Sequence, residues 1–111
     1  MATITNLYID AGADYSIIVT ANQSNGDPLN LSSYTIKSQI RKSYASSTAY
    51  DFTAAIYAAT SGKIRLSLTS TQTSAIKPGR YLYDVEITSA AGEKRRVLEG
   101  IIIVTPEITQ V

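Results

Sequence analysis

The sequence of 111 residues has no histidine, no cysteine and no tryptophan, and it has a single phenylalanine. Without histidine and cysteine, the chain lacks the usual general base, the thiol nucleophile, and the ligands of zinc, haem and iron–sulfur sites. Ten Lys and Arg residues stand against nine Asp and Glu, and a net charge of +1 provides no strong attraction for nucleic acid or an anionic membrane. We therefore expect no enzymatic activity, no cofactor, and no nucleic-acid or membrane partner.

Long apolar runs are also absent. The longest run of Ile, Leu and Val covers residues 101–104, far short of the roughly 18 apolar residues that a membrane-spanning helix requires. Residues 1–10 have neither the basic region nor the apolar core of a signal peptide. We interpret the chain as one soluble domain, residues 1–111, made in a cytoplasm.

Apolar residues recur with a period of two rather than 3.6, which is typical of β-strands. Residues 63–69 show the pattern most clearly, with Ile64, Leu66 and Leu68 on one face and Lys63 and Arg65 on the other. Seven such segments are separated by turn signals: residues 3–9, 15–22, 34–44, 50–58, 63–69, 81–88 and 94–105. Residues 70–76 lack the period-two pattern, and they predict one short helical turn.

Seven short strands in about 100 residues favour an all-β fold. We predict an immunoglobulin-like Greek-key β-sandwich of about seven antiparallel strands, with a closed barrel as the alternative. Tyr81 directly follows a Pro-Gly turn at the start of the penultimate strand. This is the position of a tyrosine corner, in which the hydroxyl bonds back to the preceding backbone.

The last predicted strand has two apolar faces. We assign one face to the core; it consists of Leu98, Gly100, Ile102 and Val104. The other face surrounds Glu99 with Val97, Ile101 and Ile103, and contiguous exposed apolar area usually marks an interface. Alternatively, the N-terminal strand or residues 106–111 fold over this stripe.

We predict that the stripe contacts a protein partner. The predicted partner-contact residues are Val97, Ile101, Ile103, Tyr44 and Tyr57. Outward tyrosines, including Tyr8, would also suit a glycan, because tyrosine combines an apolar face with a polar tip.

Two further groups of polar side chains could form a catalytic or a metal site. Asp84 and Glu86 share the outer face of one strand, where we interpret them as solvated charges rather than a catalytic pair. A calcium cage would need two Asp/Asn-rich turns to meet at one end of the fold, and ordinary turn geometry explains the same residues. The residues of these turns are Asp10, Asp14, Asn25 and Asp27.

Three stretches of the sequence resemble a known protein family. Residues 27–35 read Asp-Pro-Leu-Asn-Leu-Ser-Ser-Tyr-Thr and are followed by Gln-Ile-Arg at 39–41. Residues 78–86 read Pro-Gly-Arg-Tyr-Leu-Tyr-Asp-Val-Glu, and the chain closes with Leu-Glu-Gly at 98–100 and Val-Thr-Pro-Glu-Ile-Thr at 104–109. Together they resemble the immunoglobulin-like virion module of tailed bacteriophages, which is related to the N-terminal domain of upper baseplate proteins. Relatives of this form occur in contractile-tailed marine and cyanobacterial phages.

The resemblance runs from about residue 6 to residue 109, with Ser33 where the family commonly has glycine. It implies a virion structural protein, an accessory subunit that docks on the tail or baseplate through protein–protein contacts. Capsid decoration, or glycan and host-receptor binding at the particle surface, are the alternatives. The implied partners are other virion proteins and further copies of the chain, in a particle assembled in the host cytoplasm. The family contributes no catalytic or cofactor residues.

Overall fold

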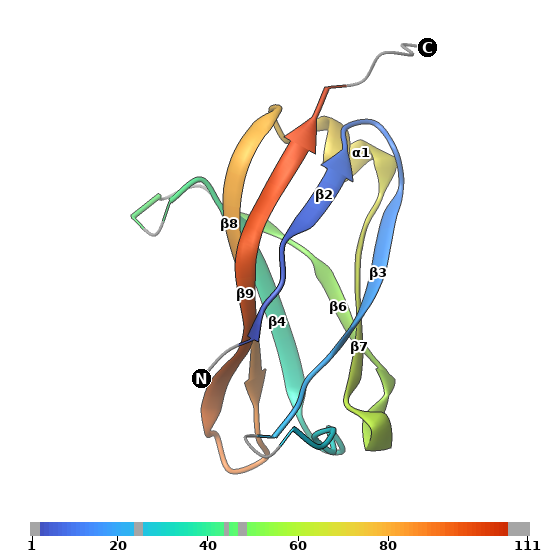
Figure 1. The fold of residues 1–111 in the computed structure, drawn as a ribbon, viewed down its shortest axis with the longest axis vertical. Helices are drawn as coiled ribbons and strands as arrows, with labels where there is room; N and C mark the ends of the chain where they lie inside the picture. The colour runs from blue at the N-terminus through green and yellow to red at the C-terminus, as the bar shows by residue number, and fades with distance from the viewer. Residues whose placement is uncertain (1–2, 24–25, 44, 47–48, 107–111) are drawn as a thin grey trace.

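The computed structural model describes residues 3–23, 26–43, 45–46 and 49–106 (Figure 1). The strands are β1 (Thr3–Ile4), β2 (Leu7–Asp10), β3 (Tyr15–Thr20), β4 (Thr35–Arg41), β5 (Ala49–Asp51), β6 (Thr53–Ala58), β7 (Lys63–Leu68), β8 (Gly79–Thr88) and β9 (Lys94–Thr105). A 3₁₀ turn, η1 (Ala59–Ser61), precedes β7, and the short helix α1 (Ser70–Ser74) follows it. No helix in this described part of the chain is long and apolar enough to cross a membrane.

The strands form two sheets that face each other across one core. The larger sheet has the order β1-β9-β8-β4-β5, with β2 also paired to β9, and the smaller has the order β3-β7-β6. This division matches an immunoglobulin-like Greek-key sandwich, in which the second, fifth and fourth strands oppose the third, sixth and seventh. The predicted fold class is confirmed, and the sheets do not close into a barrel.

One difference from the expected antiparallel arrangement lies at the edge of the larger sheet. Both β1 and β2 run parallel to β9, with Leu7 opposite Ile102 and Asp10 opposite Thr105. The chain then turns through residues 11–14 and enters the smaller sheet as β3. The N-terminal segment therefore adds β1 and β2 to the larger sheet at its β9 edge.

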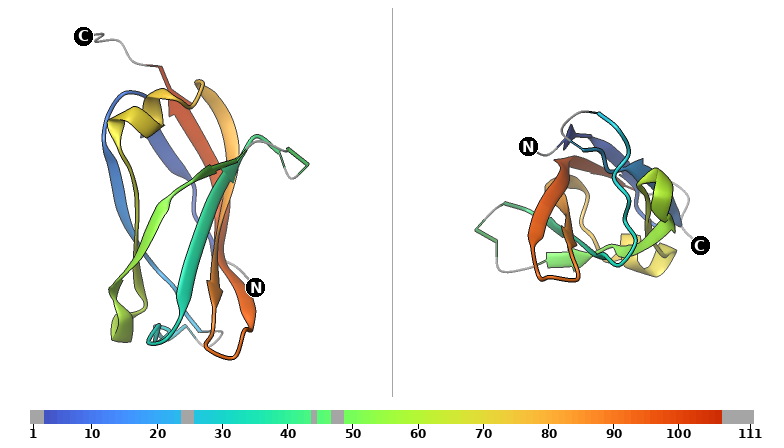
Figure 2. Two further views of the ribbon diagram at one scale, coloured as in Figure 1. Left: turned by 180° about the vertical axis from the view of Figure 1, so that it is seen from behind. Right: turned by 90° about the horizontal axis from the view of Figure 1, so that it is seen from below.

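The predicted strand over residues 50–58 is divided between the two sheets. Figure 2, seen from behind, shows this segment in green as it passes from the β4 side toward β7. Phe52 marks the crossing: its side chain is buried, its amide donates to the carbonyl of Ser38, and its ring meets Tyr83 edge-on at 6.2 Å. The burial of this aromatic ring fixes the position at which the chain changes sheet.

The predicted strand over residues 15–22 lies elsewhere than expected. The apolar run at residues 17–19 indicates a central strand, but among the described strands β3 pairs with β7 alone and forms an edge of the smaller sheet. Ile18 lies opposite Arg65 on the outer face and is 41% exposed, whereas Val19 lies opposite Ile64 on the inner face and is buried.

The period-two pattern correctly identifies the core-facing residues of the central strands. In β8 the buried positions alternate strictly, at Tyr81, Tyr83, Val85 and Ile87. They pack against residues of the smaller sheet that include Ile64, Leu66 and Leu68, all buried. These two layers form the rigid base for the outer surface described below.

The connection between β7 and β8 contains the predicted helical turn. Thr69 caps α1 in a capping box with Gln72, which satisfies amide groups at the start of the helix. Beyond the helix, the Tyr81 hydroxyl donates to the carbonyl of Lys77 at 2.6 Å. The predicted tyrosine corner is thus confirmed.

Ser33 occupies the turn that leads into β4. Tyr34 donates its amide hydrogen to the Leu31 carbonyl, and Ser33, the third residue of this turn, has a φ of 67°. A positive φ at this position is characteristic of glycine. Glycine would therefore adopt this conformation without the strain that Ser33 has.

Candidate functional site

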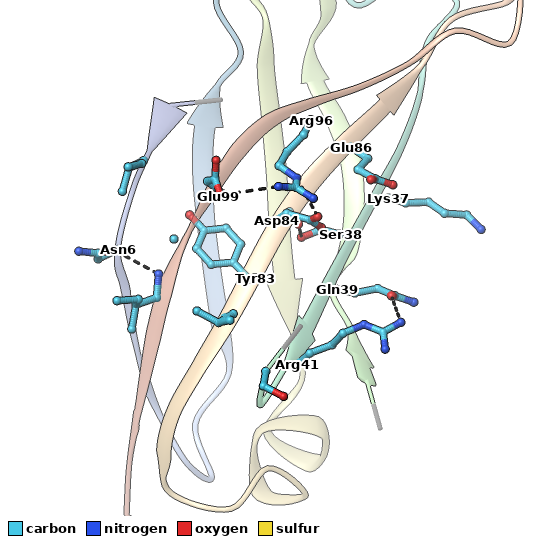
Figure 3. A pocket seen from close by; sticks show the side chains of 15 residues that line it. Asn6, Lys37, Ser38, Gln39, Arg41, Tyr83, Asp84, Glu86, Arg96 and Glu99 are labelled. Atoms are coloured by element: carbon cyan, nitrogen blue, oxygen red, sulfur yellow. Dashed lines mark hydrogen bonds and ion pairs between the residues drawn. The ribbon is translucent and has the colours of Figure 1, made fainter. Parts of the chain in front are cut away.

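A groove runs across the outer face of the larger sheet (Figure 3). Its volume is about 590 Å³, and side chains from β4, β8 and β9 form most of its lining. Pockets of 300–1,000 Å³ are typical of small-molecule sites. The groove is therefore large enough to receive a ligand.

Strand register arranges the groove residues in rows across the sheet. One row joins Gln39, Asp84 and Glu99, and the next joins Arg41, Leu82 and Ile101. The groove thus has a polar row beside an apolar pair. The sequence alone does not reveal this arrangement, because the rows join residues up to 60 positions apart, Gln39 to Glu99.

Arg96 connects two of the acidic side chains. Its Nε lies 3.2 Å from Oδ2 of Asp84, and its Nη1 lies 3.7 Å from Oε1 of Glu99, as the dashed lines in Figure 3 show. Burial raises the pKa of Asp84 above its usual value, and the charge of Glu86 adds to this, while Arg96 opposes it. Asp84 is therefore a partly buried charge, because its side chain is 30% exposed and is paired with Arg96.

Two amide side chains of the groove have their oxygen atoms already occupied. Oε1 of Gln39 accepts from Nη2 of Arg41 at 3.1 Å, and Oδ1 of Asn6 accepts from the amide of Ile101 at 3.1 Å. These bonds orient each amide group and leave its nitrogen atom as the donor. The groove therefore combines oriented amide donors with carboxylate acceptors.

The predicted stripe on β9 is correct for two of its three residues. Ile101 and Ile103 lie on the outer face and are partly exposed. The prediction that Val97 faces outward is wrong, because it is 6% exposed and belongs to the core. The register of β8 and β9 shifts here, from Val85 opposite Leu98 to Glu86 opposite Arg96, which makes Val97 the extra residue of a bulge.

Of the two predicted tyrosines, the one that the structure describes, Tyr57, does not join the stripe. Tyr57 lies on β6 of the smaller sheet, is 53% exposed, and has the guanidinium of Arg65 over its ring at 5.0 Å. It therefore belongs to the opposite face of the sandwich. Tyr44 lies outside the described residues.

Two residues that the sequence interpretation did not place here extend the stripe. Ile4 is 73% exposed and Tyr8 is 71% exposed, and they lie beside Glu99 and Ile103 of β9. We call Ile4, Tyr8, Ile101 and Ile103 the edge patch. The N-terminal strand therefore enlarges the apolar stripe instead of covering it, which only the parallel pairing with β9 could reveal.

The two turns considered for calcium lie at opposite ends of β3. Asp10 and Asp14 precede this strand, and Asp27 comes after it, while Asn25 lies outside the described residues. The Asp14 carboxylate accepts the amide hydrogen of Ser70 at 2.7 Å, and Asp10 accepts from the Thr105 hydroxyl. The two turns therefore cannot form one cage. In the described ranges, no cluster of three acidic side chains is arranged to hold a metal ion.

Comparisons with known proteins reveal distant structural similarity. No protein-family model and no curated protein matches the sequence. Over 97% of its length the chain is similar to part of a family 123 glycoside hydrolase from Clostridium perfringens, at 12% identity and a TM-score of 0.44. It is also similar to murine CRIg, at 14% identity and a TM-score of 0.42, with 92% of each chain covered.

A third similar structure is an internalin-like protein of Listeria monocytogenes, at 15% identity, a TM-score of 0.45 and 96% coverage of this chain. The chain spans 24% of the hydrolase chain and 28% of the internalin-like chain. At these identities and TM-scores, the similarity carries no argument about function.

Proposed function

We propose that the chain is a non-enzymatic structural protein of a bacteriophage particle, an accessory subunit that docks on the tail or baseplate through the edge patch. The motifs at residues 27–41, 78–86 and 98–109 support the phage assignment through their resemblance to virion modules. The exposed edge patch supports the docking role. Its partners would be other virion proteins, with further copies of the chain in the same particle.

The single observation that carries the docking proposal is the exposure of Ile4 and Tyr8 beside Ile101 and Ile103. Large apolar side chains grouped on one surface usually mark an interface, and tyrosine is among the residues that contribute most to binding energy. Their strands belong to a sheet whose other face is packed against the core. The patch is therefore presented on a rigid support.

The proposed role requires no chemistry of the chain. The sequence has no histidine or cysteine, and the Asp84 carboxylate of the groove is paired with Arg96. Many copies in one particle would multiply individually modest contacts.

Incorporation into particles tests the proposal. We expect the double variant Tyr8→Ser, Ile103→Lys, tagged at the C-terminal end, to be incorporated at least about tenfold less than the parent chain. The matched control is Tyr57→Ser, Ile18→Lys, which changes the same residue types on the opposite sheet. Thermal unfolding of each purified chain establishes that it is folded. Equal incorporation of the two double variants would refute docking through the edge patch.

Decoration of the capsid is the second candidate, and it uses the same patch. The two candidates differ only in the partner, so the location of the tag on the particle distinguishes them. Electron microscopy with a gold-labelled antibody against the tag should show label on the tail or baseplate. Label on the head would replace the first candidate with the second.

A further inference from the structure

We propose that the groove on the larger sheet binds a neutral oligosaccharide through Gln39, Asp84 and Glu99, over the apolar pair Leu82 and Ile101. The site is separate in function from the edge patch, although Ile4 and Ile101 belong to the patch and also line the groove. The proposal rests on the shape, the hydrogen-bonding groups and the charge balance of the groove.

The shape favours a small convex ligand. The groove is a hollow of about 590 Å³ on the outside of a sheet. A second flat sheet laid on it would leave this space unfilled, and unfilled space forfeits packing energy. A ligand that enters the hollow, such as one or two sugar rings, avoids that loss.

The hydrogen-bonding groups match the hydroxyl groups of a sugar. The carboxylates of Asp84 and Glu99 accept hydrogen bonds, and the Gln39 amide nitrogen donates, because its oxygen already accepts from Arg41. Arg96 bridges the two carboxylates, so their positions are set before a ligand arrives. Fixed groups lose less entropy on binding than free ones.

The apolar pair would contact the apolar face of a sugar ring. Leu82 and Ile101 lie opposite each other on β8 and β9, and each is two residues along its strand from Asp84 or Glu99. A sugar ring has a C–H face beside its polar rim of hydroxyl groups. In the groove, the polar row likewise lies beside the apolar pair, so the hydroxyl groups of a sugar can bond to the row while its C–H face packs on the pair.

The charge balance favours a neutral ligand. Three carboxylates line the groove, on Asp84, Glu86 and Glu99, and three cations, on Lys37, Arg41 and Arg96. The lining is thus neutral overall, which gives no advantage to phosphates or to nucleic acid. Among the described residues of the lining, the one aromatic ring is that of Tyr83, which is buried and faces the core, so it offers no surface for a nucleobase.

This composition also predicts weak binding by a single chain. A site that is open to solvent, and whose described lining offers no aromatic stacking surface, should have a dissociation constant in the millimolar range. Multiple copies on one surface would raise the apparent affinity without new contacts. The experiment must therefore detect weak binding directly.

Nuclear magnetic resonance of the ¹⁵N-labelled chain provides this sensitivity. The probes are maltose, lactose, mannobiose and chitobiose, with a sulfated disaccharide as the anionic comparison. We expect saturable shifts of the amide signals of Gln39, Leu82 and Asp84 with at least one neutral disaccharide, and smaller shifts with the sulfated one. Shifts that are absent for all four, that lie outside the groove, or that are equal with the sulfated sugar overturn the proposal.

Matched variants test the named residues. Asp84→Asn and Glu99→Gln keep the shape of each side chain but remove its charge, and each should weaken binding about tenfold, as expected for a lost hydrogen bond to a charged group. Glu93→Gln removes a carboxylate from the β8–β9 turn, outside the groove, and should leave binding unchanged. The spectrum of each variant reports whether it is folded. Unchanged binding by both groove variants overturns the assignment.

Discussion

The hydroxyl of Tyr83 donates a hydrogen bond to the carbonyl oxygen of Thr5, at 2.6 Å and across 78 positions of sequence. Thr5 joins β1 to β2, and its carbonyl lies against Gly100 of β9. A Cβ atom on Gly100 would be 2.1 Å from that oxygen. Gly100 thus leaves space for the carbonyl oxygen of Thr5, and Tyr83 donates a hydrogen bond to the same atom.

Gly100→Ala should therefore displace Thr5 and lower the free energy of unfolding by about 1–3 kcal/mol, the usual range for overpacking. Tyr83→Phe should lower it by about 1 kcal/mol through the lost hydrogen bond. Because both substitutions act through Thr5, the double variant should lose less than the sum of the two. Urea denaturation of the three variants measures the coupling, and strict additivity would contradict it.

Tyr81→Phe removes the hydroxyl of the tyrosine corner and leaves the ring in place. The loss of its bond to the Lys77 carbonyl should lower the free energy of unfolding by about 1 kcal/mol. Tyr57→Phe is the control, because the Tyr57 side chain is exposed. Thermal denaturation should show a lower melting temperature for the first variant only, and an equal effect of both would argue against the corner as a stabilising contact.

Ser33→Gly should stabilise the protein. Ser33 has a φ of 67°, where a side chain is strained and glycine is not. We expect a gain of about 0.5–1 kcal/mol in the free energy of unfolding, because the relieved strain exceeds the larger entropy loss of glycine on folding. The neighbouring Ser32→Gly, at a position that does not have a positive φ, should give no such gain, and calorimetry of the two variants makes the comparison.

Thr73→Val tests the contact between α1 and the β2–β3 turn. The buried Thr73 hydroxyl accepts from the amide of Gly12 at 3.0 Å and donates to the carbonyl of Ala13 at 2.9 Å. Valine leaves both backbone groups without this partner, so the free energy of unfolding should fall by about 1–3 kcal/mol. Thr71→Val, at an exposed position of the same helix, should change it by less than about 0.5 kcal/mol in urea denaturation.

Alkaline pH should destabilise the fold through its buried tyrosines. Burial raises the pKa of Tyr83 from 10.0 to about 12, with a smaller contribution from Tyr15, and burial also raises the pKa of Tyr15 and Tyr81. Between pH 10 and 12 the unfolded chain has lost protons that the folded chain retains, so stability falls as the pH rises. The slope is at most about 1.4 kcal/mol per pH unit for each tyrosine.

Urea denaturation across this pH range measures the slope, and the ultraviolet absorbance of tyrosinate reports the ionisation itself. Tyr83→Phe should reduce the slope, even though it also lowers stability at neutral pH. An unchanged slope in this variant would show that Tyr83 does not contribute.

The sequence predicts the strands well where burial alternates without interruption. β7, β8 and β9 lie where the period of two placed them, and the tyrosine corner follows from Tyr81 after a Pro-Gly turn. Each of these features depends on residues close together in the chain. Local pattern is therefore sufficient for them.

The errors arise where a contact between distant residues overrides the pattern. The bulge at Val97 depends on the register against β8, and the change of sheet at Phe52 depends on packing against Tyr83. The groove and the edge patch likewise require the neighbours of β9, which are β8 on one side and the parallel β1 and β2 on the other. Neither surface is visible in any single segment of sequence.

The parallel pairing of β1 with β9 also determines where an attached label would lie. Thr3 is opposite Leu98, whereas β9 continues for seven more residues, roughly 23 Å, to Thr105. A fusion joined ahead of Thr3 would emerge beside Ile4, within the edge patch, while one joined beyond Pro106 would leave near the opposite end of a module 44 Å long. An affinity tag joined directly to Thr3 would therefore lie against Ile4, whereas the five residues that follow Pro106 separate a tag at the other end of the chain from Ile103.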